Sequence, residues 1–216
     1  MSEEIFYKTF WATYLQIENE LIAVFKYIEL STDNYKTYSS KLLKIYLQIG
    51  SEIDVCFKKY CNELSVNDCD NMNDYKFFLD NNDVDFFDEE IIVDNRNIIL
   101  KPWYELKNNN LFWWKAYNKV KHERDNEVTI GGITQLAYKF ANLENILNSL
   151  GGLYILLMNL FSKIKGNREE SPVPNSKIFH MKSSRWEECK NFTAIYASTG
   201  KDEGLYLQSP KDYLFW

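Results

Sequence analysis

Apolar residues recur every three or four positions along three long stretches of the chain, which is the spacing of helices with one buried face. The first predicted helix runs from Glu3 to Glu29, and the second runs from Ser39, its N-cap, to Leu64. A short connection joins these two helices, so they are expected to pack as an antiparallel hairpin. The third helix is predicted over Leu111–Arg124 and the fourth over Thr134–Lys163.

The helical pattern breaks between the second and third helices. Residues Ser65–Asp88 are rich in Asn and Asp, and a short helix is predicted within them near Asp74–Leu79. The segments Glu90–Val93 and Ile98–Lys101 flank the turn-forming sequence Asp-Asn-Arg-Asn and predict a small β-hairpin. Residues 65–105 are therefore interpreted as an acidic insertion into the helical domain.

The character of the sequence changes again after Gly166, which is a natural C-terminal stop for the fourth helix. The sequence Ser-Pro-Val-Pro at 171–174 is typical of a linker. Two runs beyond it, Phe192–Ala197 and Leu205–Leu207, predict a second hairpin. The apolar residues 213–216 are expected to dock on the fold or to form an interface.

These patterns together predict a mainly α fold with a four-helix core. The helical domain is assigned to residues 1–165, and a small β-containing C-terminal extension to residues 166–216. The chain has only 8 Gly and 4 Pro, too few for the many turns of a sandwich or barrel. With 45% apolar and 26% charged residues, it is expected to be folded and soluble.

Several functional classes do not fit the sequence. No signal-peptide pattern is present, and the longest apolar run, Leu150–Phe161, is shorter than the roughly 20 residues of a membrane span. We therefore expect a cytoplasmic protein with no membrane partner. The four Cys form no CxxC pair and only two His are present, so no metal is predicted. The common cofactor fingerprints are also missing, so no cofactor is predicted.

The net charge of −6 conceals an uneven distribution. Residues 65–95 contain ten acidic residues and one lysine, so the rest of the chain has a net charge of +3. The acidic total therefore does not exclude an anionic partner such as RNA. The aspartate-rich run that begins at Asp80 does not fit a calcium-binding EF-hand, because Val84 stands where an oxygen ligand is needed.

The third predicted helix contains the densest polar cluster. Lys115, Asn118 and His122 fall on one helical face, with Lys119 and Arg124 near its edges. A histidine beside cations and a fixed amide is suited to holding a phosphodiester and exchanging a proton near neutral pH. The alternative is an ordinary solvated helix face on which the histidine has no role.

A second polar cluster, Gly-Ser-Glu-Ile-Asp at 50–54, lies on the second helix. Glu52 is next to the apolar stripe and is expected to be partly buried, whereas Asp54 is expected to be solvated. A partly buried carboxylate needs a cationic or hydrogen-bonding partner. We therefore predict that Glu52 pairs with a polar residue of the third helix. A plain surface carboxylate is the alternative.

The third helix also resembles a known family. A Trp-rich helix with Tyr-Asn-Lys-Val-Lys-His at 117–122, followed by Ala-Asn-Leu-Glu-Asn at 141–145, is similar to the HEPN superfamily of helical proteins. The family motif is Arg, a polar residue, three variable residues and His. Asn118 and His122 match its last two fixed positions, whereas Tyr117 stands at the arginine position.

The resemblance implies a metal-independent ribonuclease or RNA-directed effector of bacterial defence or toxin–antitoxin systems. It also implies a homodimer with the motif helices facing each other across the two-fold axis. The predicted catalytic residues are His122, Asn118, Lys115, Lys119 and Glu52. The predicted substrate-binding residues are Lys121, Arg124, Tyr117 and Asp54.

Two other functions fit the same residues. Tyr117 in place of Arg favours a non-catalytic HEPN-like module that binds RNA, nucleotide or protein. The aromatic load instead fits a structural dimerisation protein. A cognate protein partner would bind through the aromatic surface or through the C-terminal tail.

Overall fold

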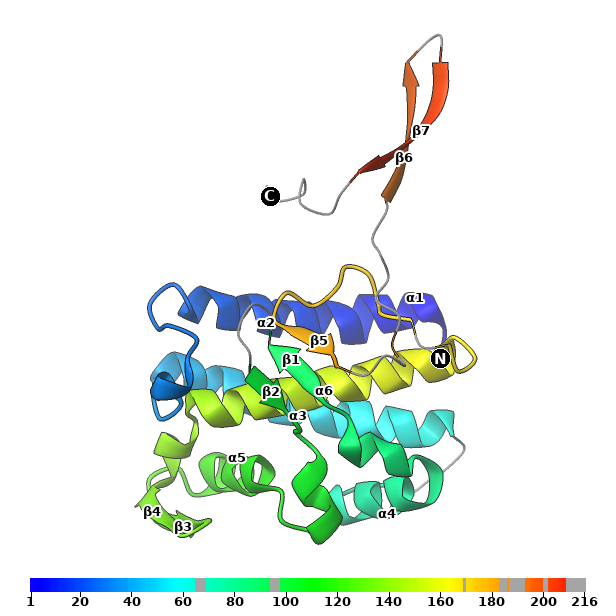
Figure 1. Ribbon diagram of the computed structural model, residues 1–216. Coiled ribbons are helices and arrows are strands. Elements are labelled where there is room, and N and C mark those ends of the chain that lie inside the picture. The colour runs from blue at the N-terminus through cyan, green and yellow to red at the C-terminus, as the bar shows by residue number, and fades with distance from the viewer. Residues whose placement is uncertain are drawn as a thin grey trace.

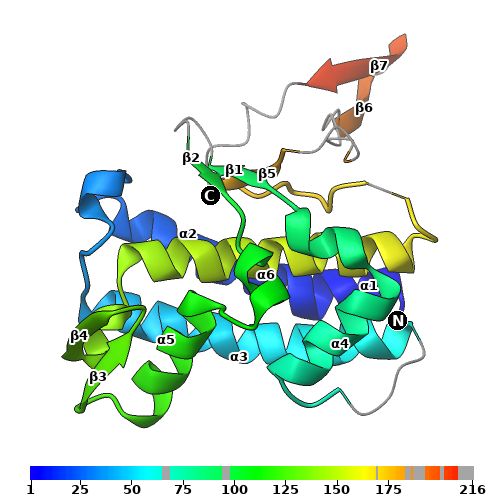
Figure 2. The ribbon, with the colours of Figure 1, turned by 60° about the horizontal axis from the view of Figure 1, so that its bottom comes forward.

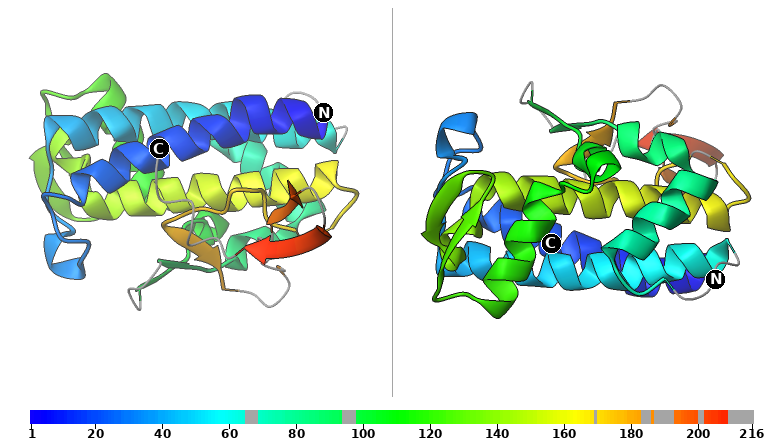
Figure 3. Two further views of the ribbon diagram at one scale, coloured as in Figure 1. Left: turned by 90° about the horizontal axis from the view of Figure 1, so that it is seen from above. Right: turned by 90° about the horizontal axis from the view of Figure 1, so that it is seen from below.

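The computed structural model describes residues 1–64, 69–93, 98–168, 170–182, 186, 193–199 and 202–208. Three long helical segments lie side by side in it (Figures 1 and 3). The first consists of α1 (Glu3–Ile5), a π-helical stretch at Phe6–Trp11 and α2 (Ala12–Val24); the others are α3 (Ser40–Glu63) and α6 (Leu143–Ile164). α3 and α6 run in the same direction, opposite to α1 and α2 (Figure 1).

The N-terminal hairpin of helices is confirmed. α3 begins where the sequence predicted, because the Ser39 hydroxyl accepts a hydrogen bond from the Leu42 N–H at 3.1 Å. α2 ends at Val24 rather than at the predicted Glu29. Beyond Val24 the chain leaves the bundle, and the side chain of Tyr27 is 88% exposed.

The predicted start of the fourth helix is wrong. Thr134 belongs to strand β4 (Ile133–Leu136), which pairs with strand β3 (Glu127–Ile130) in an antiparallel ribbon. Gly131 and Gly132 form the turn with φ of +57° and +79°, values that favour glycine. α6 begins only at Leu143, where the side chain of Asn142 caps the helix.

α6 is the central helix of the core. Among the described residues it is the one helix long and apolar enough to cross a membrane, and 94% of its apolar window is buried inside the fold. Its first two N–H groups donate to carbonyls of the loop before α3, at Thr37 and Tyr35. The N-terminus of α6 is therefore closed by the chain itself.

The acidic insertion contains the predicted helix and hairpin. α4 (Met72–Asn82) starts with a capping box formed by Asn71 and Asp74. Strands β1 (Ile91–Val93) and β2 (Ile98–Leu100) pair as expected, and β5 (Phe179–Met181) adds to β1 in a three-stranded antiparallel sheet of order β2-β1-β5. The insertion and the C-terminal extension thus share one sheet.

α4 and α5 (Phe112–His122) lie across the same side of the long helices, below them in Figure 1. α5 covers one end of α3 and α4 covers the other (Figures 2 and 3). Two buried indoles support this layer. Trp113 Nε1 donates to the Pro102 carbonyl at 2.8 Å, and Trp103 Nε1 donates to the Gly152 carbonyl at 3.0 Å.

The first part of the C-terminal extension is attached to α2 by a buried carboxylate. Glu18 is fully buried and accepts hydrogen bonds from the Tyr14 hydroxyl at 3.0 Å, the Ser176 hydroxyl, and the Lys177 and Ile178 N–H groups. The predicted second hairpin is also present, as β6 (Thr193–Thr199) and β7 (Asp202–Gln208). The apolar tail 213–216 lies outside the described residues.

Candidate functional site

The two faces of α5 have opposite characters, as its sequence predicted. Trp113, Ala116, Tyr117 and Val120 are buried. The predicted polar residues Lys115, Asn118, Lys119 and His122 are exposed or half-buried on the other face. The Tyr46 hydroxyl of α3 donates to the Trp113 carbonyl, which ties the first turn of α5 to the core.

Tyr117, which the sequence predicted as a substrate-binding residue, is buried in the core. Its side chain is only 4% exposed and packs edge-on against Tyr46 with ring centroids 6.0 Å apart. α3 presents Gly50 to this ring, and a Cβ at Gly50 would lie 2.2 Å from Tyr117 Cε2. The missing side chain at Gly50 therefore lets α5 approach α3 closely.

A cleft of about 630 Å³ lies between the polar face of α5 and the β3–β4 ribbon. Three of the predicted catalytic residues line it: Lys115, Asn118 and Lys119. The remaining lining residues are Glu105, Asn110, Phe112, Thr129, Ile130 and Gly131. The sequence analysis named none of these six residues: Phe112 belongs to α5 itself and Asn110 directly precedes it, whereas the other four come from segments whose approach to α5 has no local pattern.

Both lysines of the cleft have neighbouring acceptors. Lys115 Nζ donates to Asn110 Oδ1 at 2.7 Å, and Lys119 Nζ lies 2.6 Å from Glu123 Oε1. Within the described part of the chain, the Asn118 side chain forms no hydrogen bond. The cleft wall thus offers two cations and an amide that are available to a ligand.

His122 is the last residue of α5 and is exposed. It does not line the 630 Å³ cleft, and its imidazole contacts no polar or aromatic group among the described residues. The other two cations near it face different groups. Lys121 Nζ stands 5.7 Å from the centre of the Tyr117 ring, and Arg124 Nε donates weakly to the Val120 carbonyl at 3.5 Å.

The predicted pairing of Glu52 with the third helix is wrong. Glu52 is half-buried, yet its carboxylate has no hydrogen bond or ion pair in the described part of the chain. It shares a face of α3 with Lys41, eleven residues earlier, whose ammonium pairs with Glu20 of α2. That face lies towards α2 and not towards α5. Burial without a partner raises the pKa of Glu52 above its ordinary value.

Asp54 is the carboxylate that lies towards α5, because it is one helical turn from Gly50. It accepts a hydrogen bond from the Tyr75 hydroxyl at 2.6 Å and lies 3.2 Å from Lys58 Nζ. Burial raises the pKa of the Tyr117 hydroxyl, and the charge of Asp54 raises it further. Asp54 therefore lies on the side of α3 that faces α5, but its hydrogen bond and its ion pair are with Tyr75 of α4 and Lys58 of α3 and not with the polar face of α5.

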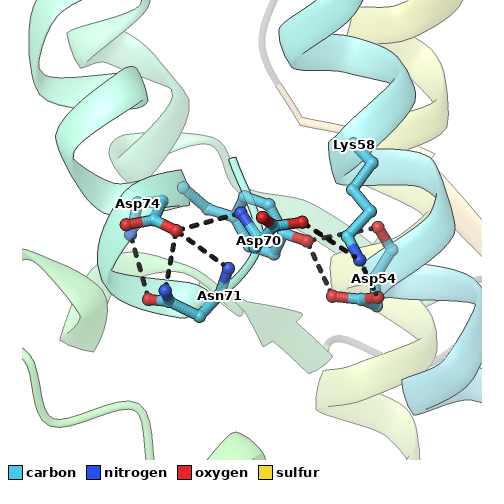
Figure 4. A network of polar contacts seen from close by, with 6 residues as sticks. Asp54, Lys58, Asp70, Asn71 and Asp74 are labelled. Atoms are coloured by element: carbon cyan, nitrogen blue, oxygen red, sulfur yellow. Dashed lines mark hydrogen bonds and ion pairs between the residues drawn. The ribbon is translucent and has the colours of Figure 1, made fainter. Parts of the chain in front are cut away.

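The surroundings of Asp54 form a polar network that connects α3 to the start of α4 (Figure 4). Lys58 bridges Asp54 and Asp70, with its ammonium 3.6 Å from the Asp70 carboxylate. Asp74 accepts hydrogen bonds from the backbone N–H groups of Asp70 and Asn71. These groups satisfy one another, so the network acts as a brace between the two helices.

No arrangement suited to a metal ion appears in the described ranges, where no three His, Cys, Asp or Glu side chains converge. The aspartate-rich run at the end of α4 forms contacts within α4 and with α3 instead. Asp80 pairs with Lys76 at 2.7 Å, and Asp83 accepts from the Tyr60 hydroxyl at 2.6 Å.

Two smaller hollows adjoin the cleft at Phe112. One, of about 290 Å³, includes Tyr104, Glu105 and Asn148, and the other, of about 370 Å³, includes Lys36, Tyr38 and Lys139. Glu105 Oε2 accepts the Phe112 N–H at 3.1 Å and so caps α5 from a preceding turn.

No family model, curated protein or solved structure matches this chain. The interpretation of the site therefore depends on its own residues and geometry.

Proposed function

We propose that the chain is a HEPN-like protein with a four-helix core that acts as a metal-independent ribonuclease or RNA-directed effector in the bacterial cytoplasm. The observation that carries this proposal is the polar face of α5. Lys115, Asn118 and Lys119 line an open cleft, and His122 follows one turn later at the exposed end of the same face. Cations, an amide and a titratable imidazole are the groups that phosphodiester cleavage requires.

In the proposed reaction, the lysines bind the phosphate of an RNA strand and stabilise the charge that develops on it. An imidazole removes the proton from a ribose 2′-hydroxyl, whose oxygen attacks the phosphorus. The bond to the 5′-oxygen of the next nucleotide breaks, and that oxygen takes up a proton. The products end in a 2′,3′-cyclic phosphate and a 5′-hydroxyl.

This chemistry needs a proton donor as well as a base, and each chain supplies one histidine on α5. A two-fold homodimer with the α5 helices near the axis would place two copies of His122 in one site. The exposure of His122 supports this proposal, since a residue at the end of α5 is accessible to a second copy. A sedimentation mass of one chain at micromolar concentration would rule out this arrangement.

The test is cleavage of a 5′-labelled RNA by the purified protein in EDTA. His122→Ala is expected to lower the rate by roughly 10²–10⁴-fold, the usual contribution of a general acid or base. His180→Gln, at the other histidine of the chain, is the matched control and should keep the activity. Cleavage that depends on added magnesium, or full activity of His122→Ala, would contradict the proposed mechanism.

A non-catalytic RNA- or protein-binding module is the second candidate, and the position of Tyr117 favours it. The residue at the motif arginine position is buried, so the arginine cation of the family pattern has no direct counterpart there. RNA binding without cleavage in the same assay would support this candidate.

A further inference from the structure

The cleft between α5 and the β3–β4 ribbon has two chemically different walls. On the α5 side, Lys115, Asn118 and Lys119 supply two positive charges and an amide. On the ribbon side, Thr129, Ile130 and the Gly131 turn supply a hydroxyl, an apolar side chain and backbone. A ligand that fills this space must therefore have an anionic part and a flat or apolar part.

The polar wall is suited to a phosphate group. The Lys115–Asn110 contact is exposed, and the Lys119–Glu123 pair is partly exposed; such contacts are weak because water competes for both partners. A phosphate between the two ammonium groups replaces these weak contacts with stronger, charge-assisted hydrogen bonds. The Asn118 amide lies between the lysines in the sequence and adds a donor.

The apolar wall is fixed in place. A Cβ at Gly131 would lie 2.7 Å from the Phe112 ring, so the turn rests directly on this side chain. Phe112 also packs edge-on against Phe140 with ring centroids 6.1 Å apart. Ile130 is buried, whereas Phe112 is half-buried, so the preorganised apolar surface on which a planar ring can stack is that of Phe112.

Among the residues that line the cleft, Glu105 is the acidic one. Its carboxylate already accepts the Phe112 N–H at the N-terminus of α5, where the helix dipole offsets part of the charge. The remaining lone pairs of Glu105 are free to accept an N–H group of a ligand. A nucleobase carries such groups on its edge, whereas a simple phosphate does not.

We propose that this cleft binds one nucleotide, with its phosphate at Lys115, Asn118 and Lys119 and its base against Phe112. The volume of about 630 Å³ lies within the range of small-ligand sites. The nucleotide is either free or a single unit of an RNA strand, and in the second case the inference rests on the proposed function. Neither source requires His122, which lies outside the cleft.

The experiment measures binding by calorimetry with the four ribonucleoside 5′-monophosphates, inorganic phosphate and the four nucleosides. At least one monophosphate is expected to bind at least tenfold more tightly than phosphate or its own nucleoside. An oligodeoxynucleotide, which lacks the attacking 2′-hydroxyl, serves as the strand probe. If the monophosphate binds and competes with the oligodeoxynucleotide, the site belongs to a strand. If the oligodeoxynucleotide does not bind, the ligand is a free nucleotide.

Two threonines of the ribbon give a matched pair of variants. Thr129 lines the cleft and Thr134 does not, yet they face each other across the ribbon with their hydroxyl oxygens 2.8 Å apart. Thr129→Trp should fill the cleft and weaken nucleotide binding at least tenfold, whereas Thr134→Trp should leave it unchanged. Both substitutions break the same hydroxyl contact, and tryptophan suits a strand, so a general effect on folding would appear in both.

The charge contribution is tested on α5. Lys115→Gln should weaken binding several-fold, and Lys44→Gln, at an exposed position of α3 outside the cleft, should not. Failure of every monophosphate to bind, or equal effects of Thr129→Trp and Thr134→Trp, would overturn the proposal. The proposed ribonuclease activity is measured separately. Nucleotide binding without RNA cleavage would support the nucleotide site and contradict the proposed ribonuclease activity. RNA cleavage without nucleotide binding would support the ribonuclease activity and contradict the nucleotide site.

Discussion

Substitution of Gly50 by alanine tests the contact that joins α3 to α5. In an ordinary helix interior this change stabilises a protein by about 1 kcal/mol, because glycine has the lower helix propensity. Here the new Cβ would lie 2.2 Å from the Tyr117 ring, whereas ordinary contacts are 3.4–4 Å. The ring must therefore move by more than an ångström, yet Tyr46 and Trp114 pack against it.

Overpacking of this kind costs about 1–3 kcal/mol and exceeds the gain in helix propensity. Set against the gain of about 1 kcal/mol, the free energy of unfolding of Gly50→Ala is expected to fall by up to about 2 kcal/mol, which corresponds to a loss of up to roughly 8 °C in Tm for a chain of this size. Urea unfolding followed by tryptophan fluorescence measures the change. Ser51→Ala, at an exposed position one residue along α3, is the control and should change stability by less than about 0.5 kcal/mol.

A double-mutant cycle separates the contact from other effects of the substitution. In a Tyr117→Ala background the obstacle is gone, so Gly50→Ala should now be stabilising by about 1 kcal/mol. The sign of the effect is thus expected to reverse. If Gly50→Ala stabilises the protein that retains Tyr117, the close approach of α3 and α5 does not exist as described. The placement of Asp54 towards α5 would then also be wrong.

Three further predictions concern buried or half-buried polar groups. Tyr117→Arg should lower the free energy of unfolding by about 3 kcal/mol, measured by urea unfolding, because it buries a charge in place of a packed ring. Tyr117→Phe, the control, should lower it far less. An unchanged stability of Tyr117→Arg would contradict the position of Tyr117 in the core. Glu52→Gln should raise stability at pH 7 by a few tenths of a kcal/mol after allowance for solvent screening. The raised pKa of Glu52 means that the folded state holds its proton more tightly, so wild-type stability falls as pH rises from the unfolded pKa through the folded pKa. Urea unfolding across that window should show a smaller pH dependence for Glu52→Gln than for the wild type, and identical profiles would refute this. Glu18→Ala should release the start of the C-terminal extension and speed tryptic cleavage at the exposed Lys177, with Glu4→Ala as the exposed control; equal cleavage rates would show that Glu18 is not what holds the segment.

The helical faces of this protein follow from its sequence alone. Apolar spacing predicted the buried side of α3, and the spacing of Lys115, Asn118 and His122 predicted the polar face of α5, although Tyr117 of its core face was predicted to bind substrate. Cap residues such as Ser39 marked helix starts, because a side-chain oxygen next to the first turn satisfies free N–H groups locally. Each of these features depends on residues within one or two turns, which is why a linear pattern contains them.

The partners of those faces were decided by tertiary structure. Leu136 and Phe140 continue the helical spacing of α6 backwards, but Gly131 and Gly132 allow a tight turn, and pairing with β3 makes residues 133–136 a strand. Strand formation depends on that second strand, which the periodicity of the fourth segment does not include.

The same distinction applies to the candidate site. The sequence placed Glu52 and Asp54 near each other on α3, and only the direction from which α5 approaches decides that Asp54 lies towards it. That direction is set by the contact of Tyr117 with Gly50 across the helix interface. The cleft likewise exists because Glu105 and Thr129 meet α5 from separate parts of the chain. Helix periodicity determines which residues share a face, whereas the packing of distant segments determines what that face meets.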